Sequence, residues 1–285
     1  MSVQPSKRSL ASARTLARFG RFSVALASLV MVAGCNNKQA GGAQSPERQS
    51  QSEFDIARDL FHKGDPRGAL DHARMAVDLD DGNAKALYFV SVLYAFFCDL
   101  DQGLEGADCK IDEAEKYARM AVKTDGNLRD GKNLLGQILI LRGQYAEAAT
   151  VLEPLTKDPA YASSHLAWGN YGWALVNQGK LDEGIIALQN STIEPKFCVG
   201  HYRLASAYEK KGDLNRAEAE LTHALTTDRP ECQALQDAWE ARGNVRQRLG
   251  RLEEAAADFN QCAELGPKSR TGKRCAAKSH SLAGT

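Results

Sequence analysis

The chain of 285 residues balances 36 lysines and arginines against 36 aspartates and glutamates, but these charges are unevenly distributed. Residues 1–34 carry five basic residues and no acidic one, which leaves 31 basic against 36 acidic residues in the remainder. A protein that binds nucleic acid through its phosphates needs a basic surface excess, so the charge balance argues against a nucleic-acid partner.

The chain begins with a leader that has the features of an export signal. Basic residues precede an apolar run of 11 residues, from Phe22 to Val32, which has the length of a signal-peptide core and is too short to span a bilayer. Small residues lead from this run to Cys35, and a polar stretch follows. The arrangement resembles a bacterial lipoprotein signal, with Val32 where leucine is usual. The resemblance implies that residues 1–34 are removed and Cys35 is acylated; an ordinary secretory signal with a chance cysteine is the alternative.

Three further regions follow the signal. Residues 35–52 are rich in Ser, Gln and Gly, a composition that buries too little apolar surface to fold, so they are predicted to form a flexible tether. Residues 53–266 have apolar residues at helical spacing and form the predicted folded domain. Residues 267–285 are predicted to be a C-terminal cap with a basic tail, for which solvation is the ordinary interpretation and contact with a polyanion or membrane surface the alternative.

A repeat organises residues 53–266. Five glycines stand at equivalent junctions, and a small residue follows five positions after each: Gly64, Gly143, Gly179, Gly212 and Gly250, then Ala69, Ala148, Gly184, Ala217 and Ala255. With Ala114 as a sixth instance, the small residues are 45, 34, 36, 33 and 38 residues apart. A period near 34 with a small residue at this place resembles the tetratricopeptide repeat. The predicted fold class is all-α: a solenoid of about six helix pairs with a C-terminal cap.

Individual repeats match parts of the tetratricopeptide pattern, W-x2-L-G-x2-Y…A-x3-F…P. Trp168 and Gly172 stand at its first positions in the fourth repeat, and Trp239 and Gly243 in the sixth. The junction glycines are expected to end each first helix in a left-handed conformation, and the small residues to let the two helices of a pair cross closely. Arg242 replaces the expected leucine, so the first helix of the sixth repeat is predicted to pack atypically.

The second repeat contains an insertion. Its first helix is predicted at about residues 84–97, and the 45-residue spacing exceeds a 34-residue period by 11. This excess places the insertion at residues 98–109, with a cysteine at each end. A disulfide Cys98–Cys109 would close its neck and contribute ~2–3 kcal/mol, with two free thiols as the alternative.

Six cysteines follow Cys35 in a compartment that permits disulfides, and 15 pairings are possible in principle. Cys198 and Cys232 stand at or just before the starts of the first helices of repeats five and six, which lie side by side, so their pairing is feasible. Cys262 lies on the last helix of repeat six and Cys275 in the cap, and a disulfide between them would pin the cap to the solenoid end. No cysteine or histidine spacing typical of zinc is present, and no metal site is predicted.

No motif for catalysis stands out. The six histidines are scattered along the helices, with no H-x-x-x-H pair, no G-x-S-x-G elbow and no phosphate-binding glycine loop. The sequence therefore predicts a binding protein, neither an enzyme nor the holder of a cofactor.

The repeat resemblance implies where a partner binds. In tetratricopeptide repeats the first helix of each pair lines the concave face, which holds peptides or helices. The residues expected there are Tyr88, Phe89, Val92 and Phe96 from repeat two, Asn133 and Gln137 from repeat three, Asn170 and Trp173 from repeat four, and Tyr202 from repeat five. An aromatic strip is also typical of a core, but aromatic residues come in adjacent pairs here, so one buried stripe cannot hold them all.

The lipoprotein signal, polar tether and six repeats together resemble the pilotin lipoproteins of type IV pili, of the PilF, PilW and Tgl type. The stretch from Tyr171 to Leu204 and the Cys198–Cys232 arrangement carry most of the likeness. The resemblance implies an outer-membrane lipoprotein, anchored on the periplasmic face, that binds secretin subunits and promotes their insertion and multimerisation. Asn36, following the acylated cysteine, fits outer-membrane sorting. The alternative is an adaptor lipoprotein for another envelope complex, such as Tad-type secretion or recruitment of cell-wall hydrolases.

Overall fold

The structure is a computed structural model that describes residues 44–98 and 109–283. The leader, Cys35 and the first part of the predicted tether lie outside these residues. The helices of the described part are α1 (Pro46–His62), α2 (Pro66–Leu79), α3 (Ala84–Phe96), α4 (Ile111–Thr124), α5 (Arg129–Leu141), α6 (Tyr145–Thr156), α7 (Ser164–Asn177), α8 (Leu181–Ser191), α9 (Cys198–Lys211), α10 (Leu214–Thr226), α11 (Pro230–Gln233), α12 (Gln236–Arg248), α13 (Leu252–Leu265) and α14 (Arg270–Ala283).

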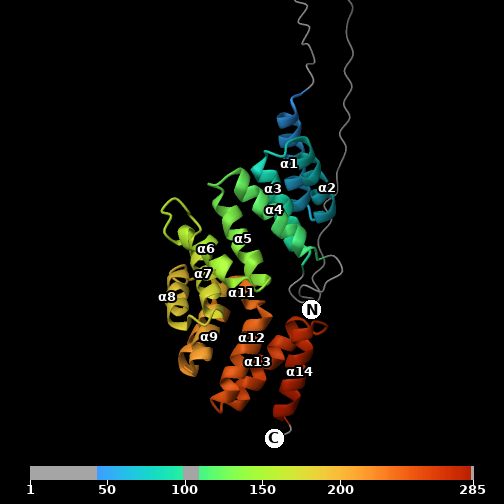
Figure 1. The fold of residues 1–285 in the computed structure, drawn as a ribbon. Helices are drawn as coiled ribbons and strands as arrows, with labels where there is room; N and C mark the ends of the chain where they lie inside the picture. The colour runs from blue at the N-terminus through green and yellow to red at the C-terminus, as the bar shows by residue number, and fades with distance from the viewer. Residues whose placement is uncertain (1–43, 99–108, 284–285) are drawn as a thin grey trace, which may run out of the picture. The chain divides into compact units, whose positions relative to one another are not determined.

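These helices stack as antiparallel pairs that follow one another along the chain (Figure 1). The pairs are α1/α2, α3/α4, α5/α6, α7/α8, α9/α10 and α12/α13, with the single turn of α11 before the last pair and α14 packed on α13. The first helices of successive pairs also contact each other, from α1 and α3 through α12 and α14. We call the surface formed by α1, α3, α5, α7, α9 and α12 the A face. The predicted all-α solenoid of six helix pairs with a cap is confirmed.

The turns between paired helices depend on glycine. All five predicted junction glycines adopt a positive φ, between 74° and 84°. This left-handed conformation costs glycine little and is unfavourable for residues that have a Cβ atom. A turn of this kind reverses the chain within two or three residues, which brings each second helix back along the first.

The paired helices cross at the small residues that the repeat pattern marks. The alanines at these positions are fully buried. At the α7/α8 crossing both contacting residues are glycines, and a Cβ atom on Gly172 would lie 2.9 Å from the backbone nitrogen of Leu188 and 3.0 Å from the carbonyl oxygen of Gly184. The two backbones therefore touch, and no larger residue fits there without moving a helix.

The folded domain begins earlier than the sequence predicted. Helix α1 starts at Pro46, so the prediction that the tether extends to residue 52 is wrong. Ser50 is fully buried, and its hydroxyl donates a hydrogen bond to the carbonyl oxygen of Ala76 (2.7 Å) while accepting one from Asn83 Nδ2 (2.9 Å). The composition of the segment is polar, but Ser50 docks the first turns of the helix on α2, and the buried Phe54 and Ala57 follow it on the same helix.

Arg242, which departs from the repeat pattern, is buried in the last pair. Its guanidinium donates to both carboxylate oxygens of Asp258 on α13, at 3.0 and 2.8 Å, and stacks over the ring of Trp239 at 4.8 Å. Arg246 Nη1 also donates to Asp258 (3.0 Å) and its Nε donates to Glu218 (3.0 Å). An ion-pair network therefore takes the place of the usual leucine contact between α12 and α13. This agrees with the prediction that the first helix of the sixth repeat packs atypically.

Three disulfides join the six cysteines of the described part, in the three pairs expected from the sequence. Cys98–Cys109 spans the two ends of the insertion, whose interior lies outside the described residues. Cys198, the first residue of α9, is bonded to Cys232 in α11, so the start of repeat five is linked to the approach to repeat six.

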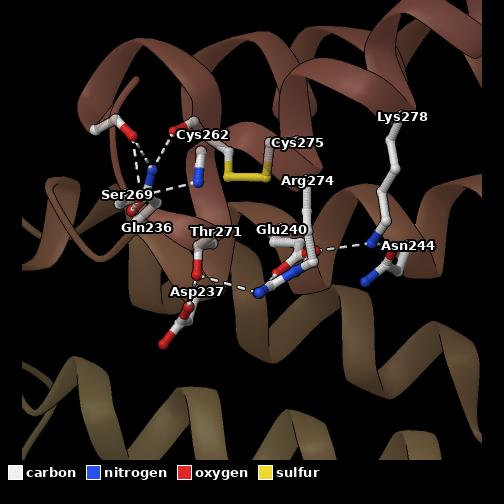
Figure 2. Close-up of a disulfide and its surroundings, with 12 residues drawn as sticks. Gln236, Asp237, Glu240, Asn244, Cys262, Ser269, Thr271, Arg274, Cys275 and Lys278 are labelled. Atoms are coloured by element: carbon white, nitrogen blue, oxygen red, sulfur yellow. Dashed lines mark hydrogen bonds and ion pairs between the residues drawn. A yellow bond between two sulfur atoms is a disulfide. The ribbon is translucent and has the colours of Figure 1, made fainter. Parts of the chain in front are cut away.

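The third disulfide, Cys262–Cys275, ties α14 to α13, and Figure 2 shows the polar contacts beside it. Arg274 Nη2 and Lys278 Nζ each donate to a carboxylate oxygen of Glu240 on α12, both at 2.8 Å. These two residues of the predicted basic tail are therefore internal partners of α12, and α14 occupies the place of a seventh first helix.

Acidification is expected to weaken this cap. Burial raises the pKa of Glu240, but the ion pairs with Arg274 and Lys278 lower it by more, so the folded pKa lies below its usual value. A folded pKa below the unfolded one means that this stabilisation is full above the unfolded pKa, about 4.3, and is lost as the pH falls through the folded pKa. Glu240→Gln should therefore lower the melting temperature at pH 7, and the difference from the unmodified chain should shrink as the pH falls below about 4.3 and vanish once this carboxyl is protonated in the folded state as well. Thermal unfolding of both chains across this range checks it; Glu231→Gln, an exposed carboxylate on α11, is the control, and a difference independent of pH would contradict it.

Candidate functional site

Four phenylalanines of α1 and α3 form a connected group on the A face at the start of the solenoid. Phe89 of α3 makes edge-to-face contacts with Phe54 (5.9 Å between ring centroids) and Phe61 (5.8 Å), both from α1. Phe61 makes a third such contact with Phe96 (5.4 Å). Phe54 is buried and Phe96 is 57% exposed, so the group runs from the core to the surface. A large aromatic ring that is held in place by its neighbours yet open to solvent is suited to contact a partner.

The other α3 residues predicted to bind a partner are intermediate in solvent exposure. Tyr88 and Val92 are half-buried. Burial raises the pKa of Tyr88, and the nearby carboxylate of Asp130 raises it further. Burial and Asp130 also raise the pKa of Tyr161, whose hydroxyl is buried without a hydrogen-bond partner. Both phenols therefore stay neutral at pH 7. Helix α3 places some of its aromatic rings in the core and others at the surface, so one buried stripe does not hold them all.

A second group, made of polar side chains, crosses the middle of the A face. Asn170 of α7 is buried; its Nδ2 donates to Asn133 Oδ1 on α5 (3.0 Å), and its Oδ1 accepts from Arg203 Nη1 on α9 (2.7 Å). Three successive first helices are thereby connected through side chains in one row.

Three more predicted residues lie on the same helices as this polar row. Trp173 lies one turn after Asn170 on α7 and is half-buried, with the ammonium group of Lys210 over its ring at 5.3 Å. Gln137 on α5 is exposed. Tyr202 on α9 is half-buried, and burial, together with Asp237 and Glu240, raises its pKa to about 12.

Of the nine predicted binding residues, four lie on α3 and five lie on α5, α7 and α9, where Asn133 and Asn170 belong to the polar row. The predicted residues do not include Phe54, Phe61 and Arg203, which take part in these contacts. Phe54 and Phe61 are seven residues apart, which is the spacing of one helix face and was available as a signal. Arg203 stands 33 residues after Asn170, one repeat later, and this register was also present in the sequence.

Two histidines of the described part have carboxylate partners on the neighbouring helix. His72 lies 2.6 Å from Glu53 and His201 2.7 Å from Glu220, each pair joining the two helices of one repeat. Residues 44–98 and 109–283 contain no cluster of three or more metal-ligating side chains. None of the helices in these ranges is long and apolar enough to cross a membrane.

Comparison with a family model supports the repeat architecture. Residues 133–195 and 202–270 match the model described as tetratricopeptide repeat. No curated protein matches the sequence.

Solved structures extend the likeness to most of the described helices. PilW, described as a widely conserved type IV pilus biogenesis factor, is 19% identical with a TM-score of 0.64, over 79% of this chain and 97% of PilW. PilF of Pseudomonas aeruginosa is 15% identical with a TM-score of 0.61, over 82% of this chain and 99% of PilF. A chain of the Cut9–Hcn1 hetero-tetramer of the APC/C is 14% identical with a TM-score of 0.66, but 43% of its own length is covered.

Proteins of different processes share this fold at such low identity, so the structural likeness establishes the fold alone. Residues 133–195 and 202–270 carry tetratricopeptide repeats, and the helix pairs and the solved structures agree on this fold for the described part of the chain.

Proposed function

We propose that the protein is a pilotin: an outer-membrane lipoprotein that binds secretin subunits through its A face and promotes their insertion and multimerisation for type IV pilus biogenesis. The exposed ring of Phe96, fixed by edge-to-face contacts with Phe61, is the observation that carries the binding part of the proposal. An apolar anchor on a row of parallel helices suits an amphipathic helix, which would lay its apolar face on it. The lipoprotein signal and the likeness of the fold to PilW and PilF support the envelope role.

Deletion of the gene tests the role as a whole. Cells without the protein are expected to keep their secretin as monomers and to lose pilus-dependent motility, and reintroduction of the gene should restore both. The measurement is immunoblotting of heat-stable secretin multimers in envelope fractions. Normal multimers in the deletion strain would contradict the pilotin role and favour an adaptor for another envelope complex.

The membrane anchor has its own test. A lipoprotein carries several acyl chains, which hold it firmly on a bilayer, whereas a chain without them has no anchor of comparable strength. Cys35→Ala is therefore expected to leave the protein unprocessed or soluble in the periplasm. Fractionation of the envelope checks the result, with Cys35→Ser as a second variant that preserves size and polarity. Outer-membrane fractionation of either variant at the level of the unmodified protein would contradict acylation at Cys35.

A further inference from the structure

Arg203 is a partly buried cation without a carboxylate partner. Among residues 44–98 and 109–283, its polar contact is the one from Nη1 to the amide oxygen of Asn170, and no carboxylate lies within ion-pair distance of its guanidinium. Burial lowers the pKa of Arg203 to about 10, which still leaves the side chain charged at neutral pH. A guanidinium has five N–H donors, so most of its hydrogen-bonding capacity is unused by these contacts.

Other inward-facing arginines of the domain are neutralised within the molecule. Arg242 forms a bidentate pair with Asp258, and Arg246 pairs with Glu218. Removal of a cation from water is costly unless a carboxylate compensates it, which explains why these pairs exist. Arg203 is also partly removed from water, but no carboxylate of the described residues compensates its charge.

The surroundings of Arg203 are those of an anion site. Along α7, Asn170, Trp173 and Asn177 lie at helical spacing on one face, and along α9 Arg203 and Lys210 lie two turns apart. Lys210 contacts Asn177 Oδ1 (3.4 Å) and the ring of Trp173, again with no carboxylate. The α7/α9 strip of the A face therefore carries two cations, each bonded to an amide oxygen, and the ammonium group of Lys210 also lies over the indole ring of Trp173.

We propose that Arg203 receives a carboxylate from an aspartate or glutamate side chain of the partner helix, forming the charge-assisted contact that the molecule itself does not supply. The proposal rests on the proposed function, because the partner is the helix bound on the A face. Arginine and carboxylate form two parallel hydrogen bonds in a fixed geometry, so the contact would set the register of the helix. The aromatic group on α1 and α3 would hold the apolar face of the same helix.

Removal of the Arg203 charge should weaken binding of the partner without lowering the stability of the chain. Arg203→Met keeps the length of the side chain and removes the charge. Its purified full-length chain, in detergent, is expected to bind monomeric secretin subunit at least tenfold more weakly, while its melting temperature stays the same or rises because an uncompensated charge is removed. Arg248→Met is the matched control: Arg248 pairs with Glu209 inside the molecule (2.7 Å), and its loss should change affinity less than twofold. Unchanged affinity of Arg203→Met, or a lowered melting temperature that accounts for the weaker binding, would overturn the proposal.

Charge reversal identifies the partner group. Arg203→Glu is expected to abolish heat-stable secretin multimers, and selection for restored motility should yield secretin changes of Asp or Glu to Lys or Arg. The deletion strain distinguishes failure of the pilotin role from failure of the carboxylate contact. If deletion leaves multimers normal, the proposed function fails; if deletion abolishes them but Arg203→Glu assembles them normally, or its suppressors fall only on neutral secretin residues, the carboxylate inference alone fails.

Discussion

A chain carrying Phe96→Asp is expected to fold and reach its membrane, yet to leave the secretin monomeric. The ring of Phe96 is more than half exposed, so its replacement removes little core contact. The ring of Phe96 also packs on Phe61, which in turn packs on Phe89. Because the ring is already ordered, burying it against a partner costs little conformational entropy. Loss of one such anchor costs at least ~2 kcal/mol of binding free energy, about thirtyfold in affinity, and a buried charge at the interface adds to this.

Heat-stable secretin multimers in envelope fractions are the readout, with circular dichroism of the purified chain as the folding check. Ile186→Asp is the matched control, because Ile186 is 60% exposed on α8, a second helix of its pair that is not part of the A face. Tyr88→Ala combined with Phe96→Ala enlarges the effect if one anchor is not enough. Normal multimers from a folded double variant would exclude this part of the A face as the binding surface.

Asp258→Ala is expected to destabilise the protein by about 3–5 kcal/mol, the largest loss predicted for a single polar side chain here. Asp258 is almost fully buried and accepts hydrogen bonds from both Arg242 and Arg246. The alanine variant leaves the guanidinium of Arg242 buried without its carboxylate. Urea denaturation of the oxidised chain measures the change.

The double variant Arg242→Leu with Asp258→Leu distinguishes the network from packing. It restores the leucine of the repeat pattern and removes both buried charges, so its stability should equal or exceed that of the unmodified chain. Glu153→Ala, which breaks an exposed ion pair with Lys157, should cause no measurable loss. A loss below about 1 kcal/mol for Asp258→Ala would show that water or other groups compensate Arg242.

The architecture could be predicted because its determinants are local and recur. A glycine that needs a positive φ, and a small residue five positions later, each act within one helix pair, and both are visible without knowledge of the other repeats. The insertion was likewise apparent from its spacing and its terminal cysteines. Such features depend on backbone sterics and chain length, which a single sequence displays directly.

The interior polar contacts could not be predicted in the same way. The sequence showed that Arg242 departs from the pattern, but not that Asp258, on the other helix of the pair, would neutralise it. Composition suggested a tether through residue 52 because it averages over residues, whereas Ser50 docks through one hydrogen bond to Ala76. Arg203 is informative because it has no carboxylate partner among the described residues, and this can be recognised only once the neighbouring helices are in place.

The disulfide that joins α14 to α13 makes the two ends of the solenoid unequal. In a linear array each repeat is held mainly by its neighbours, so an array normally frays from both ends. Cys262 and Cys275 are 13 residues apart and covalently linked, so a cap that lifts off remains beside its docking surface at high effective concentration and closes again. At the other end, α1 docks without a covalent bond within the described residues. The solenoid is therefore expected to fray mainly at α1, the end that carries Phe61 and the other aromatic anchors. A partner helix that contacts both α1 and α3 would hold α1 in place and reduce this fraying.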